Sequence, residues 1–319
     1  MDIDLLKRRR FGSSTLNVPP IAVGCAPLGD MLETFGYSVS EDDAVATVKA
    51  ALASPIDYID TAAWYGDGES ERRIGLALKG LGGLPAGAVL QTKIGRPPGT
   101  GDFSGETIKR RFERSFALLG VEHVDTVFLH GPDMTTFADA MAPGGPVEVL
   151  QGYKEQGLFD QFGVASDMSD VDLQYLETGL FDAVISANRF TMLNTNSSDL
   201  FSYACERGIA VLNAAPFGSG ILSRGPKDYP RYSYRTAPAH LIERAEKIEA
   251  ICARHSIPLA AASLQFSLRD PRITVTIAGM SQPGRIQAAL DLASIEISDD
   301  VWAEIDALGA PDSVDPATY

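Results

Sequence analysis

Short apolar runs alternate with longer amphipathic segments along nearly the whole chain. Eight apolar runs rich in β-branched residues and bounded by turn residues predict strands at 21–27, 58–62, 89–95, 124–131, 162–166, 183–189, 209–216 and 273–279. A segment with helical periodicity follows each run, and the predicted helices cover 41–53, 71–80, 106–120, 147–157, 170–179, 199–208, 240–256 and 283–294. Eight strand–helix units without a linker predict a closed (β/α)₈ barrel, and we expect a single domain over residues 1–319.

The ends of the predicted elements carry recognisable signals. A serine precedes an acidic first turn in several units, so we expect N-caps at Ser40, Ser70, Ser104 and Ser169. The basic run 7–10 lies beside the turn-like segment 11–13 and predicts a solvated N-terminal hairpin. The last stretch predicts a short helix at 299–309 followed by a proline-containing tail.

Charge and composition narrow the classes of function. The chain has 42 Asp and Glu residues against 27 Lys and Arg, a formal net charge of −15, which excludes a nucleic-acid binder that works by charge. The charged N-terminus and the lack of a long apolar run predict a soluble cytoplasmic protein without a membrane partner. We expect a monomer or a weak homo-oligomer. Three cysteines without a CxxC pair predict neither a disulfide framework nor a metal site.

The glycine-rich fingerprints of open-sheet nucleotide binders are missing from the sequence. After the first predicted strand, Gly24 and Gly29 have the wrong spacing for G-x-G-x-x-G, and G-x-x-x-x-G-K-[ST] occurs nowhere. A dinucleotide would therefore be held by a different architecture.

Polar residues end several of the predicted strands, where a barrel carries its chemistry. Asp60 ends the second strand and Tyr65 follows it, Lys93 lies near the end of the third, and His130 ends the fourth. Taken singly, Asp60 could cap a turn, and Tyr65 and His130 could be satisfied core residues. Lys93 is flanked by apolar residues and needs a partner if it is buried. We expect the four side chains to converge at one end of the barrel.

This set of groups suits proton transfer to or from a substrate oxygen. A free phenol has a pKa of about 10, and a lysine cation within hydrogen-bond reach lowers it. We expect Lys93 to act on Tyr65 in this way, Asp60 to keep Lys93 protonated, and His130 to orient the reacting oxygen. A hydride carrier must supply the other half of an oxidoreductase reaction.

The chain resembles the aldo-keto reductases, a (β/α)₈ family that uses nicotinamide cofactors without a Rossmann fold. The resemblance rests on the segments YIDTAAWYG, QTKIG, FLHGPD, FGVAS and APFGSGIL, in that order along nearly the whole chain. It implies that Asp60, Tyr65, Lys93 and His130 are the catalytic tetrad.

The resemblance also implies a set of cofactor-binding residues. Ser166 and Asp167 take the place of a Ser-Asn pair that holds the nicotinamide amide, and Arg189 takes that of a common Gln. Ala214 stands where many members stack a tyrosine. The pyrophosphate-covering segment corresponds to Pro216, Phe217, Gly218, Ser219, Gly220 and Leu222, and Gly24 belongs to the same site. After the last strand, the implied contacts are Gly279, Ser281, Gln282 and Arg285.

The cofactor and the substrate follow from how this chain departs from the family pattern. Arg285 is one cation where the 2′-phosphate of NADP often meets two, so we expect NAD, NADP or both to serve. Arg189 and the opening GCAPLGD resemble the aldose 1-dehydrogenase group, which includes a pyridoxal 4-dehydrogenase. The implied reaction oxidises a hemiacetal carbon to a lactone, with an aldose favoured, pyridoxal the alternative, and NADPH-dependent carbonyl reduction a further one. Trp64, Met134 and Phe190 are candidates for the wall of the substrate pocket.

Two rival functions use the same residues differently. Lys93 as a Schiff-base nucleophile would make the barrel an aldolase, but this leaves the pairing of Asp60 and Tyr65 unexplained. A cofactor-sensing subunit would keep the tetrad and turn over slowly. An aldolase need not lose activity when Tyr65 is replaced by Phe, whereas a sensor would bind NADPH tightly.

Overall fold

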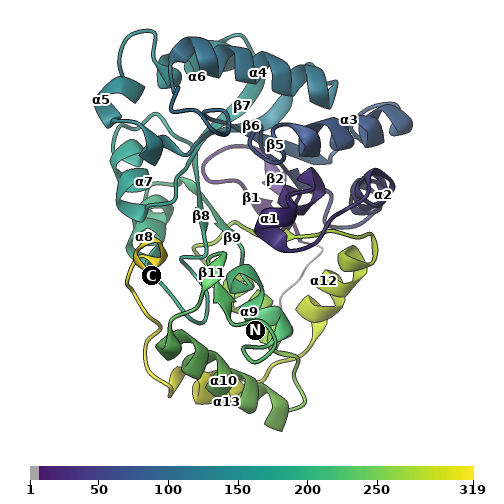
Figure 1. The fold of residues 1–319 in the computed structure, drawn as a ribbon, viewed down its shortest axis with the longest axis vertical. Helices are drawn as coiled ribbons and strands as arrows, with labels where there is room; N and C mark the ends of the chain where they lie inside the picture. Colours follow the sequence, from purple (N-terminus) through teal and green to yellow (C-terminus); the bar gives the residue numbers. More distant parts are fainter. Residues whose placement is uncertain (1–6) are drawn as a thin grey trace.

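The computed structural model describes residues 7–319, and a closed barrel of eight parallel strands lies at its centre (Figure 1). In hydrogen-bonded order the strands are β12 (Val275–Gly279), β3 (Ile21–Gly24), β4 (Tyr58–Asp60), β5 (Val89–Ile94), β6 (Val124–His130), β7 (Phe159–Ala165), β8 (Ala183–Ala187) and β9 (Ala210–Ala214). β9 pairs with β12 and closes the ring. All carboxyl ends therefore lie at one end of the barrel, called the mouth below. The predicted (β/α)₈ fold is confirmed.

Helices surround the barrel (Figure 1). The layer next to the strands contains α2 (Glu41–Leu52), α3 (Glu69–Leu81), α4 (Gly105–Leu119), α6 (Pro146–Glu155), α7 (Ser169–Leu176), α8 (Ser198–Glu206), α11 (Leu259–Leu268) and α12 (Gly284–Ser294). The loops hold the short helices α1 (Leu32–Phe35), α5 (Phe137–Ala140) and α9 (Ile221–Arg224), and outside them lie α10 (Ala239–Arg254) and α13 (Asp299–Asp306). No helix among residues 7–319 is long and apolar enough to cross a membrane.

The predicted helix at 240–256 is not the helix that completes the seventh unit. That segment forms α10, which packs against α11 and α13 outside the barrel, whereas α11 contacts β12. Seven of the ten residues of α11 are buried, and apolar or small side chains lie on nearly all sides of this helix. A helix without a polar face lacks the 3.6-residue periodicity, so α11 could not be recognised from the amino-acid pattern.

Two of the four predicted N-caps are correct. The hydroxyl oxygens of Ser40 and Ser104 accept hydrogen bonds from the backbone N–H groups of residues 43 and 107. Ser70 and Ser169 instead lie inside α3 and α7. Ser70 is buried and donates to the Cys25 carbonyl at 2.8 Å, and Ser169 bonds to side chains of the loop before α8. Their hydroxyls satisfy buried partners in neighbouring loops and do not cap their own helices.

A small hairpin closes the amino-terminal end of the barrel. β1 (Arg9–Arg10) and β2 (Asn17–Val18) pair antiparallel, and Phe11 of their turn is buried with the residues of the barrel lumen. The predicted hairpin is present, but two residues of its basic run are bonded to other parts of the protein. Arg8 forms an ion pair with Asp57 at 2.9 Å, and the Arg9 guanidinium donates to two backbone carbonyls at 2.8 and 3.1 Å.

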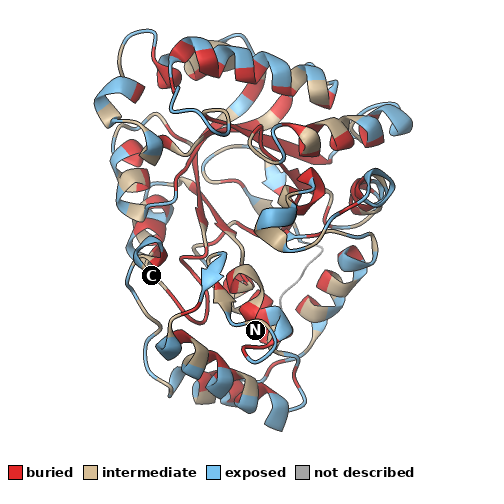
Figure 2. Ribbon diagram, in the orientation of Figure 1, coloured by how far each residue is buried: buried red, intermediate tan, exposed pale blue. Residues whose placement is uncertain are grey.

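The core has two main layers, one inside the strands and one between strands and helices. Figure 2 shows the strands buried and the outer faces of the helices exposed. The lumen is filled by side chains that alternate along the strands, among them Tyr58, Val89, Phe128, Leu212 and Ile277. This packed interior leaves the mouth as the place where polar side chains converge.

Candidate active site

The four predicted catalytic residues lie close together at the mouth because neighbouring strands carry them. Asp60 is the last residue of β4, Lys93 lies one residue before the end of β5, and His130 is the last residue of β6. Asp60 is in register with Gln91, so its side chain lies next to that of Lys93 on the inward face. Tyr65 comes from the turn between β4 and α3.

The Lys93 ammonium group is at the centre of this cluster. Its Nζ lies 2.6 Å from Asp60 Oδ1, donates to Tyr65 Oη at 3.0 Å and donates to the Thr61 carbonyl at 2.8 Å. Asp60 and Lys93 are both 2% exposed. Three acceptors for three donors satisfy the buried cation, and the carboxylate compensates its charge.

The electrostatics of Lys93 and Tyr65 follow from burial and from each other's charge. Burial lowers the pKa of Lys93, but Asp60 and Tyr65 more than offset this, so the pKa lies above its ordinary value. Burial raises the pKa of Tyr65 more than the Lys93 cation lowers it. The expected net lowering of the Tyr65 pKa is therefore not found, and the phenol is protonated at neutral pH.

His130 is neutral at the mouth. Its ring lies edge-on to Tyr65, with centroids 6.1 Å apart and planes at 85°. Burial and the nearby charges of Lys93 and Arg111 lower its pKa to about 3. A neutral imidazole has one N–H donor and one acceptor, which suits it to hold a carbonyl or hydroxyl oxygen.

The turn that carries Tyr65 is held by backbone and guanidinium contacts. The N–H of Ala63 donates to the Lys93 carbonyl at 2.9 Å, and Arg111 of α4 donates to the Ala63 carbonyl at 2.7 Å and to the Asp67 carboxylate at 2.5 Å. Gly66 has φ +61°, and a Cβ there would lie 2.1 Å from the Gly29 carbonyl oxygen. Only glycine fits this turn without displacing the η1 (Ala26–Gly29) segment.

The structure places the residues predicted to bind the nicotinamide at the mouth after β7 and β8. The Ser166 hydroxyl donates to the Met168 carbonyl at 2.6 Å, and Asp167 is exposed. Arg189 is 3% exposed and pairs with Asp315 in the C-terminal tail, with Nη2 2.8 Å from Oδ1 and Nε 3.3 Å from Oδ2. Its Nη1 also donates to the Ala187 carbonyl at 3.1 Å, so all three nitrogens of this guanidinium already bond within the protein.

The segment predicted to cover a pyrophosphate follows β9. It includes η3 (Gly218–Gly220) and the start of α9. A Cβ at Gly218 would lie 2.6 Å from the ring of Tyr232, and one at Gly220 would lie 2.7 Å from the ring of Tyr229. Both glycines therefore make room for tyrosine rings of this chain itself. Ser219 has φ +60°, and its hydroxyl donates to the Asn188 side chain at 2.9 Å. Pro216 and Phe217 precede this turn, and Leu222 is buried behind it.

The residues predicted to meet the other end of a dinucleotide follow β12. Gly279 is in register with Gly24 of β3, and Ser281 and Gln282 lead into α12. Nothing lies within 4 Å of the position of a Cβ at Gly284, the first residue of that helix. Arg285 next to it is exposed. An open helix N-terminus beside a guanidinium is a suitable place for a phosphate group, so these residues fit the cofactor.

The three candidates for the substrate wall lie in different surroundings. Trp64 lies at the mouth with the Arg96 guanidinium 5.1 Å from its ring, and Met134 is 52% exposed in the loop after β6. Phe190 lies in the core beside α8 and α11. It is 4% exposed and packs against Phe201 and Phe266, with ring centroids 5.1 and 5.4 Å apart.

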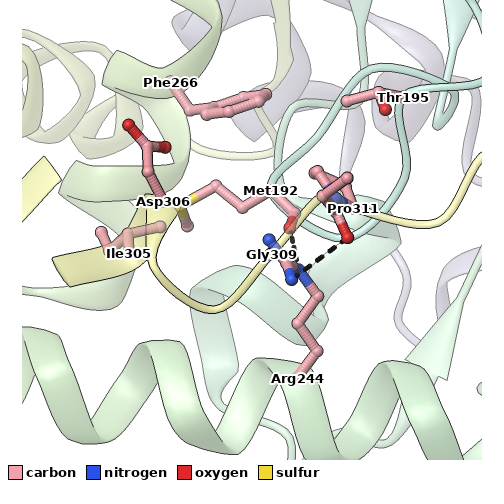
Figure 3. Close-up of a pocket in the computed structure, with 9 residues that line it drawn as sticks. Met192, Thr195, Arg244, Phe266, Ile305, Asp306, Gly309 and Pro311 are labelled. Carbon is pink, nitrogen blue, oxygen red and sulfur yellow. Dashed lines mark hydrogen bonds between the residues drawn. The ribbon is translucent and has the colours of Figure 1, made fainter. Parts of the chain in front are cut away.

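A cavity of about 170 Å³ lies on the flank of the barrel, beside α10 and α13 (Figure 3). Met192, Arg244, Phe266 and Asp306 are among the residues that line it, and the Arg244 Nε donates to the Met192 carbonyl at 2.8 Å. No residue of the mouth lines this cavity, so it is separate from the candidate active site. Within residues 7–319, no group of three or more His, Cys, Asp or Glu side chains is arranged to hold a metal ion.

Two sets of contacts at the mouth were not anticipated from the sequence. Gln91 is fully buried and bonds to Asp60, and its position two residues before Lys93 on an alternating strand was a usable signal. Asp315 pairs with Arg189, which lies 126 residues earlier in the chain, and no local sequence pattern predicts such a contact.

Fold and mouth together define a (β/α)₈-barrel enzyme with a buried lysine at the mouth. A model described as "Aldo/keto reductase family" matches residues 20–310, and the chain belongs to this family of NAD(P)-dependent oxidoreductases. The resemblance inferred from the sequence is confirmed.

Three curated relatives are similar to this chain over most of their length. A D-threo-aldose 1-dehydrogenase from Pseudomonas sp is 29% identical, over 91% of this chain and 94% of that protein. A pyridoxal 4-dehydrogenase from Microbacterium luteolum is 28% identical, over 97% and 99%. An L-galactose dehydrogenase from Arabidopsis thaliana is 27% identical, over 96% and 95%.

Solved structures share the fold. The holo form of an aldo-keto reductase from Bacillus halodurans superposes with a TM-score of 0.77 at 24% identity, covering 98% of this chain and 99% of that one. A glycerol dehydrogenase from Gluconobacter oxydans gives a TM-score of 0.74 at 22% identity, covering 98% of each.

Proposed function

We propose that this protein is an NAD(P)-dependent dehydrogenase that oxidises the hemiacetal carbon of an aldose to a lactone. The observation that carries the proposal is the Lys93 ammonium group shared between Asp60 Oδ1 and Tyr65 Oη, at 2.6 and 3.0 Å. It links a buried counter-charge to a phenol that faces the mouth. The relatives named for aldoses support a sugar as the substrate.

The proposed roles follow from the charge state of each group. In oxidation the Tyr65 phenolate takes the proton of the substrate hydroxyl, and in reduction the phenol returns it. Lys93 stabilises the phenolate, and Asp60 keeps Lys93 charged in its buried position. Neutral His130 donates a hydrogen bond to the reacting oxygen. A bound nicotinamide supplies the hydride acceptor for the carbon that loses its hydrogen.

Because Tyr65 is protonated at neutral pH, the rates of oxidation and reduction should depend on pH in opposite directions. Since its pKa lies above the ordinary value, the phenolate is a minor species at neutral pH. Oxidation therefore speeds up as the pH rises, and reduction is favoured at lower pH. Hydrolysis of the lactone product would draw the reaction toward oxidation.

We propose that the cofactor lies across the mouth between the segments after β7 and β12. Arg285 and the open N-terminus of α12 would hold the adenosine end, and Ser166 with Asp167 would hold the nicotinamide end. Because Arg285 is the one cation we assign to a 2′-phosphate, both NAD and NADP are expected to bind.

Pyridoxal is the second candidate substrate. It closes into a hemiacetal, so the same proton transfer applies to it, and a pyridoxal 4-dehydrogenase matches 97% of this chain. Carbonyl reduction with NADPH would use the same tetrad in reverse.

The test is nicotinamide reduction followed by absorbance, with NAD and NADP separately, against L-fucose, D-arabinose, L-galactose, L-glucose and pyridoxal. Turnover of a sugar supports the proposal, and turnover of pyridoxal alone moves the protein to the second candidate. Cofactor binding without turnover of any of these compounds overturns both and leaves a carbonyl reductase or a sensor. Tyr65→Phe is the control for proton transfer, since it should bind cofactor and turn over poorly.

A further inference from the structure

Two polar side chains, Tyr58 and Gln91, continue the network of the mouth down into the barrel. Tyr58 Oη donates to Gln91 Oε1 at 2.5 Å, and Gln91 Nε2 donates to Asp60 Oδ1 at 2.5 Å. Tyr58 and Gln91 are both fully buried. A hydrogen-bonded chain therefore runs from the barrel lumen through Asp60 and Lys93 to Tyr65.

The position of Gln91 is unusual for a barrel interior. Val89, Gln91 and Lys93 face inward from β5, and Val89 packs with the apolar residues of the lumen. Branched apolar side chains normally fill such layers, and burying an amide costs free energy unless its partners are supplied. Here both ends of the Gln91 amide have a partner, one of which is Asp60.

The direction of each hydrogen bond is dictated by chemistry. A carboxylate only accepts hydrogen bonds, so Gln91 must turn its NH₂ group toward Asp60. Its carbonyl oxygen then faces Tyr58, which must donate. Burial raises the pKa of Tyr58 well above its ordinary value, so this hydroxyl remains a donor over the working pH range.

We propose that Gln91 is a positioning residue for the proton-transfer step and that Tyr58 fixes the orientation of its amide. Gln91 Nε2 and Lys93 Nζ meet the same carboxylate oxygen, Asp60 Oδ1. The amide holds that oxygen in place and takes up part of its negative charge. Without it, Asp60 attracts the Lys93 proton more strongly, and less of the cation's field reaches Tyr65 Oη. This inference rests on the proposed function of Tyr65.

Other titratable and charged groups lie near this network, and none of them reverses the expected effect of Gln91 on the ionisation of Tyr65. They are Cys25 after β3, Arg111 on α4, Asp125 and His130 on β6, and Tyr234 in the turn after β10 (Arg231–Tyr232). Burial raises the pKa of the Cys25 thiol and lowers that of His130 to about 3, so neither changes charge near neutral pH. Burial likewise raises the pKa of Asp125.

The first experiment measures the pH profile of kcat for oxidation in Gln91→Met and Tyr58→Phe. Methionine keeps the length of the side chain and removes both polar ends. We expect the rising limb of the profile to move to higher pH by about 0.5–1 unit in Gln91→Met, a roughly 3- to 10-fold loss of kcat below the limb. Tyr58→Phe should move it in the same direction by less.

Tyr175→Phe is the matched control. Tyr175 is fully buried in α7, and its hydroxyl has no hydrogen-bond partner within the described part of the chain. The same loss of one oxygen from a buried ring should leave the profile in place. An equal shift of the pH profile in Tyr175→Phe would show that any loosening of the core moves the rising limb of the profile. This result would overturn the inference. So would a Gln91→Met profile that coincides with that of the parent.

A second readout does not depend on turnover. The ring-carbon resonance of Tyr65 in protein with ¹³C-labelled tyrosine, identified by its loss in Tyr65→Phe, reports the ionisation of the phenol directly. We expect its titration to begin at higher pH in Gln91→Met, and an unchanged titration would overturn the inference even if the parent has no activity on the sugars or pyridoxal. Absence of turnover would instead count against the proposed function. If Gln91→Met does not fold, Tyr58→Phe carries the same test.

Discussion

Lys93→Met tests how strongly the buried ion pair contributes to the stability of the barrel. Nζ lies 2.6 Å from Asp60 Oδ1, and both side chains are 3% exposed. Methionine keeps the apolar stem and removes the charge, so the Asp60 carboxylate stays buried without its counter-charge. Removal of one partner from such a pair costs about 3–5 kcal/mol, and we expect the free energy of unfolding to fall by about that amount.

A double-mutant cycle with Asp60→Asn isolates the interaction. Asp60→Asn alone leaves the Lys93 cation buried, whereas the double variant leaves no buried charge. We therefore expect the double variant to be more stable than the sum of the two single losses predicts, by about 1–3 kcal/mol. The assay is urea unfolding at neutral pH, followed by tryptophan fluorescence and circular dichroism.

In this cycle, the loss of activity should not follow the loss of stability. All three variants should lose turnover, because each interrupts the chain from Asp60 to Tyr65, whatever their free energies of unfolding. Strictly additive losses, or a Lys93→Met variant within about 1 kcal/mol of the parent, would show that Asp60 is not charged and desolvated in the folded state. Either result would refute the electrostatic argument, and near-normal turnover in Lys93→Met would refute the role of the cation.

Further predictions concern other parts of the chain. Tyr65→Phe should bind cofactor like the parent in a fluorescence titration while losing most of its turnover, and a near-normal rate would reassign the proton-transfer residue. Asp315→Asn leaves the buried Arg189 guanidinium without its carboxylate, so urea unfolding should show a loss of about 2–4 kcal/mol, and a loss below about 0.5 kcal/mol would mean that solvent replaces Asp315. Burial raises the pKa of Glu71 to about 7, so the folded state binds its proton more tightly than the unfolded state and loses stability as the pH rises from about 5 to 7. Glu71→Gln should remove that loss and gain about 1–3 kcal/mol on the parent over this range, and parallel stability curves would contradict the assignment.

The eight strands were predictable because each is a short apolar run between turn residues. The convergence of Asp60, Lys93 and His130 was predictable for a related reason. Parallel strands that pair side by side bring their carboxyl ends to one end of the barrel, so position within a strand translates directly into position in space. Local pattern and topology were sufficient for both.

Helix α11 and the N-caps of α3 and α7 show where local pattern fails. α11 is buried nearly all round, so it carries no amphipathic signal, and Ser70 turns to a buried partner in another loop. In each case a neighbour distant in sequence decides which face or which hydroxyl is used. Propensity and periodicity describe a segment alone and contain no information about that neighbour.

The barrel, the strand ends that carry the chemistry and the kinds of group that meet there were all predictable from the order of the residues. The balance of charge among these groups was not, because it depends on how the chain packs. The pKa of Tyr65 depends on the competition between burial and the Lys93 cation 3.0 Å away, and the Asp60 carboxylate is shared with an amide from the lumen. Desolvation and Coulomb interactions depend on distances and burial in three dimensions, and residue types along a chain specify neither.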